Sequence, residues 1–139
     1  MINSRDINEL HPKVKKLCQD FIEACKAKGI TIKIISTYRD NSYQQAIYNV
    51  GRTKPGKRIT DAKPGYSFHN YRLAFDFLPT RNGVYDWNDV HLFEECGKIG
   101  ESLGLVWGGN FKKLKDLDHL QYSDGLTLLQ LLAGEKLAN

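Results

Sequence analysis

An imidazole and a carboxylate, His69 and Asp76, flank a short and mostly apolar run near the middle of the sequence. Both side chains are common zinc ligands. Their separation spans roughly 10 Å along a helix or roughly 23 Å along a strand, so regular structure cannot bring them together. Residues 70–72 can supply a bend, after which strand alternation would place Asp76 on the face of Ala74, opposite Phe75. The stretch is a candidate for half of a metal site, although such residues more often have structural roles.

A third metal ligand is needed, because catalytic zinc usually takes three protein ligands and leaves a fourth position to water. Of the four histidines, His11 precedes a helix-starting proline and His91 lies near the polar start of a helix. Both positions favour surface or capping roles. His119 lies among alternating residues shortly after a Trp-Gly-Gly turn, which makes it the better candidate.

A zinc hydrolase also needs a general base near the attacking water, commonly a carboxylate that is not itself a ligand. Asp116 and Asp118 both precede His119. If His119 lies in a strand, Asp118 points to the opposite face, whereas a bend at the strand's start can turn Asp116 inward. We therefore predict Asp116 as the base and Asp118 as a structural or supporting residue.

Arg39 is a candidate cation, at the point where a predicted strand gives way to a loop. A guanidinium near a metal can hold a substrate carboxylate, or stabilise the oxyanion that forms when water attacks a carbonyl. A surface ion pair with the adjacent Asp40 explains the residue equally well at this stage.

Hydrophobic periodicity and turn residues predict alternating helices and strands along the chain. The predicted helices span residues 12–28, 42–50, from a cap at 86–89 to Gly104, and 126–137, and the predicted strands span 30–35, 73–77, 84–85, 105–107 and 117–122. The second helix is expected to bury Ala46, Ile47 and Val50. The last helix is expected to pack on the core, with contact to a membrane as the alternative.

Residues 52–66 form a long segment without periodicity that carries five cations and one carboxylate. Loops of this length inside small domains are usually functional or mobile. A solvated surface loop and a substrate-facing loop are equally good interpretations.

Composition limits the class of protein. With 139 residues, 41% of them hydrophobic, we expect a single domain over 1–139. The net charge of +4 favours an acidic partner such as nucleic acid, an anionic membrane or a cell-wall polymer. The three cysteines lack metal-binding spacing and suggest a reducing compartment or inert thiols. Neither a signal peptide nor a membrane-spanning run is evident, so we expect synthesis in the cytoplasm without a signal peptide and no stable membrane insertion.

The pattern Ser67-x-His69-x6-Asp76 followed by Asp116-x-x-His119 resembles the zinc peptidases of the D-alanyl-D-alanine carboxypeptidase and VanY type. Within them it is most similar to the single-domain L-alanyl-D-glutamate endopeptidases of bacteriophage lysins and related bacterial wall enzymes. The similarity covers most of the chain, including the segments 10–12, 36–39, 51–56, 65–71 and 107–109.

The resemblance implies an α+β fold with a small antiparallel sheet flanked by helices, as in Hedgehog and DD-peptidase domains. It also implies a role for each matching residue. His69, Asp76 and His119 would bind zinc, Asp116 would be the catalytic base, Arg39 the substrate or transition-state cation, and Gln44 and Ser67 supports of the site.

The function expected from this resemblance is hydrolysis of the peptidoglycan stem peptide at the L-Ala–D-Glu bond, by a monomer that acts as a phage or prophage endolysin. Such a lysin would reach the wall after the membrane is permeabilised. The alternatives are a D-alanyl-D-alanine carboxypeptidase on the same scaffold and a noncatalytic wall-binding module. A nucleic-acid binder built on residues 52–63 ranks far below them.

One position departs from the family pattern. Arg72 stands where the family usually has glycine. If that glycine holds a positive φ, arginine costs roughly 1 kcal/mol of local strain. Because Arg72 is not a predicted ligand, we expect an effect on loop geometry before one on activity.

Overall fold

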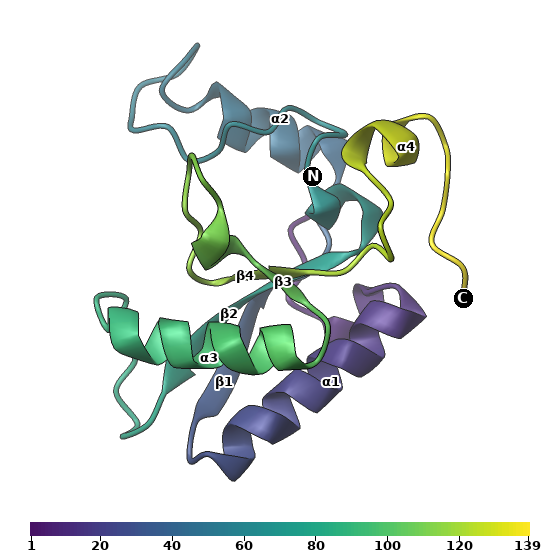
Figure 1. Ribbon diagram of the computed structural model, residues 1–139. Helices are drawn as coiled ribbons and strands as arrows, with labels where there is room; N and C mark the ends of the chain where they lie inside the picture. The colour runs from purple at the N-terminus through teal and green to yellow at the C-terminus, as the bar shows by residue number, and fades with distance from the viewer.

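The computed structural model describes residues 1–139 and is built around a four-stranded antiparallel sheet (Figure 1). In the order β1-β2-β4-β3, the strands are β1 (Thr31–Ser36), β2 (Ala74–Thr80), β4 (His119–Gln121) and β3 (Val106–Trp107). Strand β2 is central and buried along its whole length. The predicted α+β fold with a small antiparallel sheet is confirmed.

Two long helices cover one face of the sheet (Figure 1). Helix α1 (Pro12–Ala27) and helix α3 (Val90–Ser102) pack on this face because their apolar residues recur with helical spacing. The ring of Phe21 lies 5.8 Å from that of Phe75 and 5.0 Å from that of Phe77, and Phe77 lies 5.7 Å from Phe93. Burying such a side chain stabilises the fold by about 2–3 kcal/mol.

Alternation along β2 therefore divides its side chains as predicted. Phe75 and Phe77 point into the core beneath the helices, and Asp76 lies on the opposite face with Ala74. In β4 the same alternation places Leu120 against Gly100 of α3, with His119 facing away from the helices. The polar face of the two strands thus becomes the floor of the site.

The remaining helices lie beyond this face of the sheet (Figure 1). They are α2 (Asn41–Asn49), α4 (Leu128–Leu132) and the short 3-10 turns η2 (Phe68–Tyr71) and η3 (Gly108–Asn110), whereas the 3-10 turn η1 (Ile7–Glu9) lies against α1. None of these helices combines the length and the apolar character that a membrane span requires.

Three local predictions were wrong. Residues 84–85 form no strand; they lie in an exposed loop, where no neighbouring strand pairs with them. Helix α4 covers only the middle of the predicted 126–137, because Gly134 adopts a positive φ of 98° just after it. In α2 the fully buried side chain is Gln44, while Ala46, Ile47 and the C-cap Val50 are half-buried, since α2 packs on loops rather than on the sheet.

Candidate metal centre

The 3-10 turn η2 and the chain reversal that follows it bring the side chain of His69 next to Asp76. Ser67 caps η2 by accepting a hydrogen bond from the backbone N–H of His69, at 3.3 Å. The turn ends at Arg72, whose φ of 64° reverses the chain direction before β2 begins. The predicted bend over residues 70–72 is therefore present.

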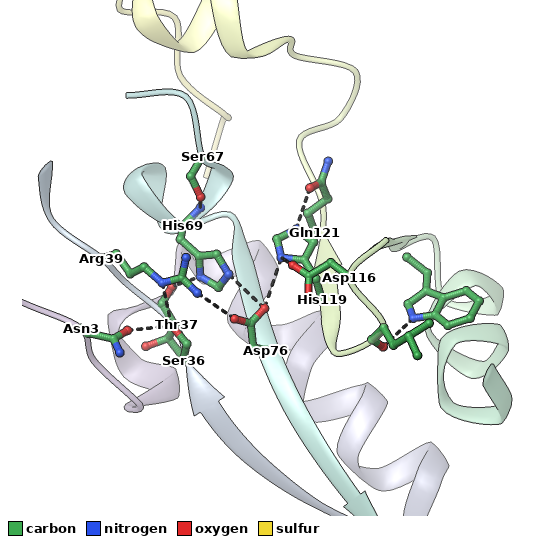
Figure 2. Close-up of polar contacts among 12 residues, drawn as sticks. Asn3, Ser36, Thr37, Arg39, Ser67, His69, Asp76, Asp116, His119 and Gln121 are labelled. Carbon is green, nitrogen blue, oxygen red and sulfur yellow. Dashed lines mark hydrogen bonds and ion pairs between the residues drawn. The ribbon is translucent and has the colours of Figure 1, made fainter. Parts of the chain in front are cut away.

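Antiparallel pairing brings in the second histidine. Asp76 of β2 lies directly opposite His119 of β4 in the sheet register. His69 and His119 thus flank Asp76 from the turn and from the neighbouring strand, with ring centroids 5.1 Å apart (Figure 2). All three side chains are buried, at 1%, 6% and 7% exposure.

The spacing of the three side chains fits a tetrahedral metal ion. Oδ1 of Asp76 lies 3.1 Å from Nε2 of His69 and 3.2 Å from Nδ1 of His119. Tetrahedral ligands at zinc–donor distances of about 2.0–2.1 Å stand about 3.3 Å apart. Two imidazoles and a carboxylate, with one side open to a groove, are the donor set of a catalytic zinc site.

Supporting contacts hold the ligands in place. Nδ1 of His69 donates a 2.8 Å hydrogen bond to the backbone carbonyl of Thr37, which leaves Nε2 as the free ligand atom. Arg39 donates from Nη2 to Oδ2 of Asp76 at 2.9 Å and from Nε to Ser36 at 3.3 Å. Arg39 thus pairs with Asp76 and not with Asp40.

The pKa values of the two histidines are shifted in opposite directions, although both side chains face Asp76. Burial lowers the pKa of His69, and the nearby Arg39 charge adds to this effect despite the attraction of Asp76. Burial also acts to lower the pKa of His119, but its hydrogen bond to Asp76 and the charges of Asp76 and Asp116 outweigh it and raise the pKa. Burial acts to raise the pKa of Asp76, yet the two histidines lower it overall.

Asp116 lies beside the ligands without joining them. Its Oδ2 is 3.8 Å from Nδ1 of His119, and its side chain is 48% exposed to the groove. Gly108 supports it closely: the Asp116 N–H donates to the Gly108 carbonyl at 3.0 Å, and a Cβ on Gly108 would lie 2.3 Å from the Asp116 carbonyl oxygen. The position suits a base that takes a proton from water near the metal.

The prediction that Asp118 points to the opposite face was wrong. The carboxylates of Asp76, Asp116 and Asp118 lie within 4.8 Å of one another, because β4 begins only at His119 and strand alternation does not reach back to Asp118. Burial, contact with Asp116 and the charge of Asp76 raise the pKa of Asp118 to about 10. At neutral pH the metal-free protein therefore holds this carboxyl protonated.

A groove of about 580 Å³ opens over the three ligands. One wall comes from the long segment 52–66, through Ile59, Thr60, Ala62 and Tyr66, and the other from Phe111 to Asp116. Arg52 is turned inward, bonding the Thr60 carbonyl at 3.0 Å and Asp61 at 3.3 Å. Part of the segment thus faces the groove, while most of its cations are exposed to solvent.

Gln44 holds this wall to helix α2. It is fully buried and donates from Nε2 to the carbonyl of Ala62 at 2.8 Å. Its Oε1 is the one buried side-chain nitrogen or oxygen atom that has no hydrogen-bond partner. Gln44 therefore contacts a wall of the groove rather than the ligands.

The other two histidines lie away from the site. His11 caps α1, accepting a hydrogen bond from Lys13 N–H at 3.1 Å, and His91 is exposed in α3. The sequence patterns assigned both correctly. The Thr37 carbonyl was missed, because a backbone group leaves no signal in the sequence.

Sequence comparison with known proteins finds peptidoglycan peptidases among those similar to this chain. The chain is 37% identical over 123 residues to the peptidoglycan L-alanyl-D-glutamate endopeptidase CwlK of Bacillus subtilis, covering 82% of this chain and 74% of CwlK. It is 25% identical over 122 residues to the L-alanyl-D-glutamate peptidase of a Listeria phage, covering 85% of this chain and 40% of the phage protein.

Solved structures share the fold at lower identity. The L-Ala D-Glu endopeptidase ChiX of Serratia marcescens superposes with a TM-score of 0.66 at 18% identity, covering 88% of this chain and 89% of ChiX. A mutant of the vancomycin-resistance D,D-pentapeptidase VanY, in complex with Zn(II), gives a TM-score of 0.64 at 18% identity, covering 95% and 89%. Residues 7–123 match the family described as VanY, D-alanyl-D-alanine carboxypeptidase, and the chain therefore belongs to that family.

Proposed function

We propose that this protein is a zinc peptidase that hydrolyses the L-Ala–D-Glu bond of the peptidoglycan stem peptide. The observation that carries the proposal is the convergence of three buried ligand atoms, from His69, Asp76 and His119, on the floor of an open groove with Asp116 beside them. Similarity to CwlK, named as an L-alanyl-D-glutamate endopeptidase, supports the choice of bond.

Each residue has a distinct task in the proposed reaction. Bound zinc would supply Lewis acidity, polarising the scissile carbonyl and lowering the pKa of a water molecule to about 7. Asp116 takes the proton of the attacking water and returns it to the leaving amine. Arg39 fixes Asp76 through Nη2 and, since it also lines the groove, stabilises negative charge on the substrate or in the transition state.

The supporting residues act on geometry. Ser67 holds the turn that carries His69, and Gln44 holds the wall that includes Ala62. We propose that neither takes part in proton transfer. The substrate is an anionic peptide, which agrees with the net charge of +4.

A D-alanyl-D-alanine carboxypeptidase is the second candidate. The description of the matching family favours it, as does the similarity to VanYB, solved in complex with D-alanine-D-alanine. The two candidates differ in whether the substrate ends at the site or continues along the groove.

Digestion of purified peptidoglycan distinguishes the candidates. With zinc present, we expect new L-alanine C-termini paired with new D-glutamate N-termini by mass spectrometry, and no cleavage with a chelator. Release of free D-alanine would instead identify the carboxypeptidase. Absence of both products would contradict both candidates and leave a wall-binding module.

We also infer an endolysin role, supported by the similarity to the Listeria phage peptidase. Expressed inside a bacterium, the protein is expected to leave cells intact until the inner membrane is permeabilised, and then to lyse them within minutes. The Asp116→Asn variant is the control and should not lyse cells. Lysis that is equally fast with this variant would contradict the role.

A further inference from the structure

Gln121 lies beside His119 on the site-facing side of β4 (Figure 2). Its Oε1 is 2.8 Å from Nε2 of His119, on the side of the ring away from Asp76. The placement follows from strand alternation, because residues two apart share a face. In the register with β2, Gln121 lies opposite the small Ala74, which leaves room for its side chain.

The contact determines which nitrogen of His119 carries the proton. A neutral imidazole has one N–H, and a side-chain carbonyl oxygen can only accept a hydrogen bond. Oε1 of Gln121 and Oδ1 of Asp76, which lies 3.2 Å from Nδ1, can both only accept a hydrogen bond. When a metal ion takes the place of a proton on Nδ1, the remaining proton is therefore on Nε2, where Gln121 accepts it. This is the tautomer that can bind a metal ion between His119 and Asp76.

The two histidines use opposite nitrogens and so need separate acceptors. His69 donates from Nδ1 to the Thr37 carbonyl at 2.8 Å and turns Nε2 inward. A backbone carbonyl fixed beside β1 cannot move away from that ring. His119 instead depends on one side chain, so its tautomer can be changed by a single substitution.

We propose that Gln121 is a positioning residue of the zinc centre, holding His119 with Nδ1 directed at the metal. The inference rests on the proposed zinc-dependent function. Hydrogen-bond partners of histidine ligands typically change metal affinity by about 10- to 100-fold when they are removed. Gln121 also lines the groove, so a role restricted to substrate binding is the competing explanation.

The test compares zinc affinity in three variants. Gln121→Leu removes the acceptor at similar size, and Gln121→Glu keeps an acceptor in the same place. Gln45→Leu changes an exposed glutamine of α2 that bonds only Asn49 and is the matched control. Zinc affinity is measured by competition with a chromophoric chelator at pH 7.5, and the His119 tautomer by long-range nitrogen–proton NMR of the zinc-loaded proteins.

We expect Gln121→Leu to weaken zinc binding about 10- to 100-fold, with loss of the slowly exchanging Nε2 proton of His119. Gln121→Glu should keep both, because a carboxylate accepts the same hydrogen bond more strongly. Gln45→Leu should match the unaltered protein. Unchanged zinc affinity and tautomer in Gln121→Leu, with a raised KM alone, would overturn the inference in favour of substrate binding.

The same measurements separate this inference from the proposed function. Tight zinc binding by the unaltered protein without peptidoglycan cleavage would overturn the substrate assignment and leave the role of Gln121 to be judged by the affinities. Failure of the unaltered protein to bind zinc would overturn the metal centre and the inference together. If Gln121→Leu is unfolded, Gln121→Ala removes the acceptor in its place: an about 10- to 100-fold loss of zinc affinity is then expected, and unchanged affinity would overturn the inference.

Discussion

Asp76 is the residue on which the site depends. Its Oδ1 faces both histidines, and its Oδ2 accepts a hydrogen bond from Arg39. The arginine supplies a countercharge for the buried carboxylate, while the two histidines lower the pKa of Asp76 and keep it ionised, as a metal ligand must be. Asp116, in contrast, is half exposed and free of the ligand cluster.

Replacing Asp116 by Asn should remove the base and leave the ligands in place. We expect a loss in kcat of roughly 100- to 10,000-fold, with zinc affinity changed only a few fold. Cleavage of purified peptidoglycan and chelator competition measure the two quantities. A nearly fully active Asp116→Asn enzyme would exclude the assignment. The control is Asp20→Asn, at a partly exposed position of α1 that pairs with Lys16.

Replacing Asp118 by Asn should largely retain activity, unlike Asp116→Asn, and should change the stability of the fold instead. The folded, metal-free protein keeps Asp118 protonated up to a pKa of about 10, whereas the unfolded chain ionises it near pH 4. This group therefore destabilises the fold increasingly as pH rises between those values. We expect Asp118→Asn to raise Tm by roughly 3–8 °C at pH 8 and hardly at all at pH 4, in metal-free thermal unfolding.

At the scale of elements, the turn between η2 and β2 carries strain that other contacts offset. Arg72 has a φ of 64°, as expected if the family glycine is needed there. Its guanidinium stacks on Tyr38, with Cζ 3.9 Å from the ring centroid, and bonds the carbonyl of Glu9 at 2.9 Å and its carboxylate. These contacts join the N-terminal segment to the turn that carries His69.

Two substitutions at Arg72 separate strain from contacts. Both Arg72→Ala and Arg72→Gly lose the contacts to Tyr38 and Glu9, but only glycine relieves the positive φ. We expect the alanine variant to have a free energy of unfolding about 1–2 kcal/mol below that of the unaltered protein. The glycine variant should be about 1 kcal/mol more stable than the alanine variant. Urea unfolding at pH 7 gives both values; an alanine variant as stable as the glycine variant would show that no strain is present.

Gly108 positions the loop that carries Asp116. A methyl group there would meet the Asp116 carbonyl oxygen at 2.3 Å and Cβ of His119 at 3.0 Å, and backbone cannot yield as a side chain can. We expect Gly108→Ala to lower kcat about 10- to 100-fold by moving the base.

The control for Gly108→Ala is a second glycine, in the core. In Gly100→Ala the added methyl meets only the side chain of Leu120, at 2.7 Å. That variant should lose stability and keep its kcat when measured below its Tm. Equal kcat values for both variants would contradict the role of Gly108.

At the scale of the whole molecule, the three candidate metal ligands come from segments that are distant in the chain. His69 in η2, Asp76 in β2 and His119 in β4 come from the two halves of the sequence. Binding to the folded state alone stabilises it by about 4 kcal/mol at a thousandfold excess of ligand over Kd. Zinc is therefore expected to stabilise the entire fold and not only the groove.

Removing zinc with a chelator should lower Tm at pH 8, and the difference should shrink as pH falls towards 5. His119, with its raised pKa, takes up a proton first, and His69, with its lowered pKa, remains neutral to lower pH. Thermal unfolding with and without zinc measures the difference, and His91→Ala is the control for nonspecific binding. A zinc effect that persists unchanged at pH 5 would contradict these ligands.

The sequence by itself determined the elements and the candidate residues. Periodicity located α1, α3 and the sheet strands, because apolar spacing directly reflects which face is buried. The His69, Asp76 and His119 set came from motif spacing, and the structure brings these residues together. A strand forms only where a second strand is available to pair with it, so the local pattern at residues 84–85 was insufficient to predict their structure.

Only the tertiary structure decided how those residues are oriented. The pairing of Asp76 with His119 follows from sheet register, and the orientation of Asp118 from where β4 begins, which no local pattern specifies. The partner of Arg39 proved to be Asp76 and not its neighbour Asp40, because the buried carboxylate of Asp76 needs a countercharge more than the partly exposed one of Asp40. The candidate ligands were identified from local motifs and the family resemblance, whereas the charges and hydrogen bonds around each of them depend on segments that meet only when the chain folds.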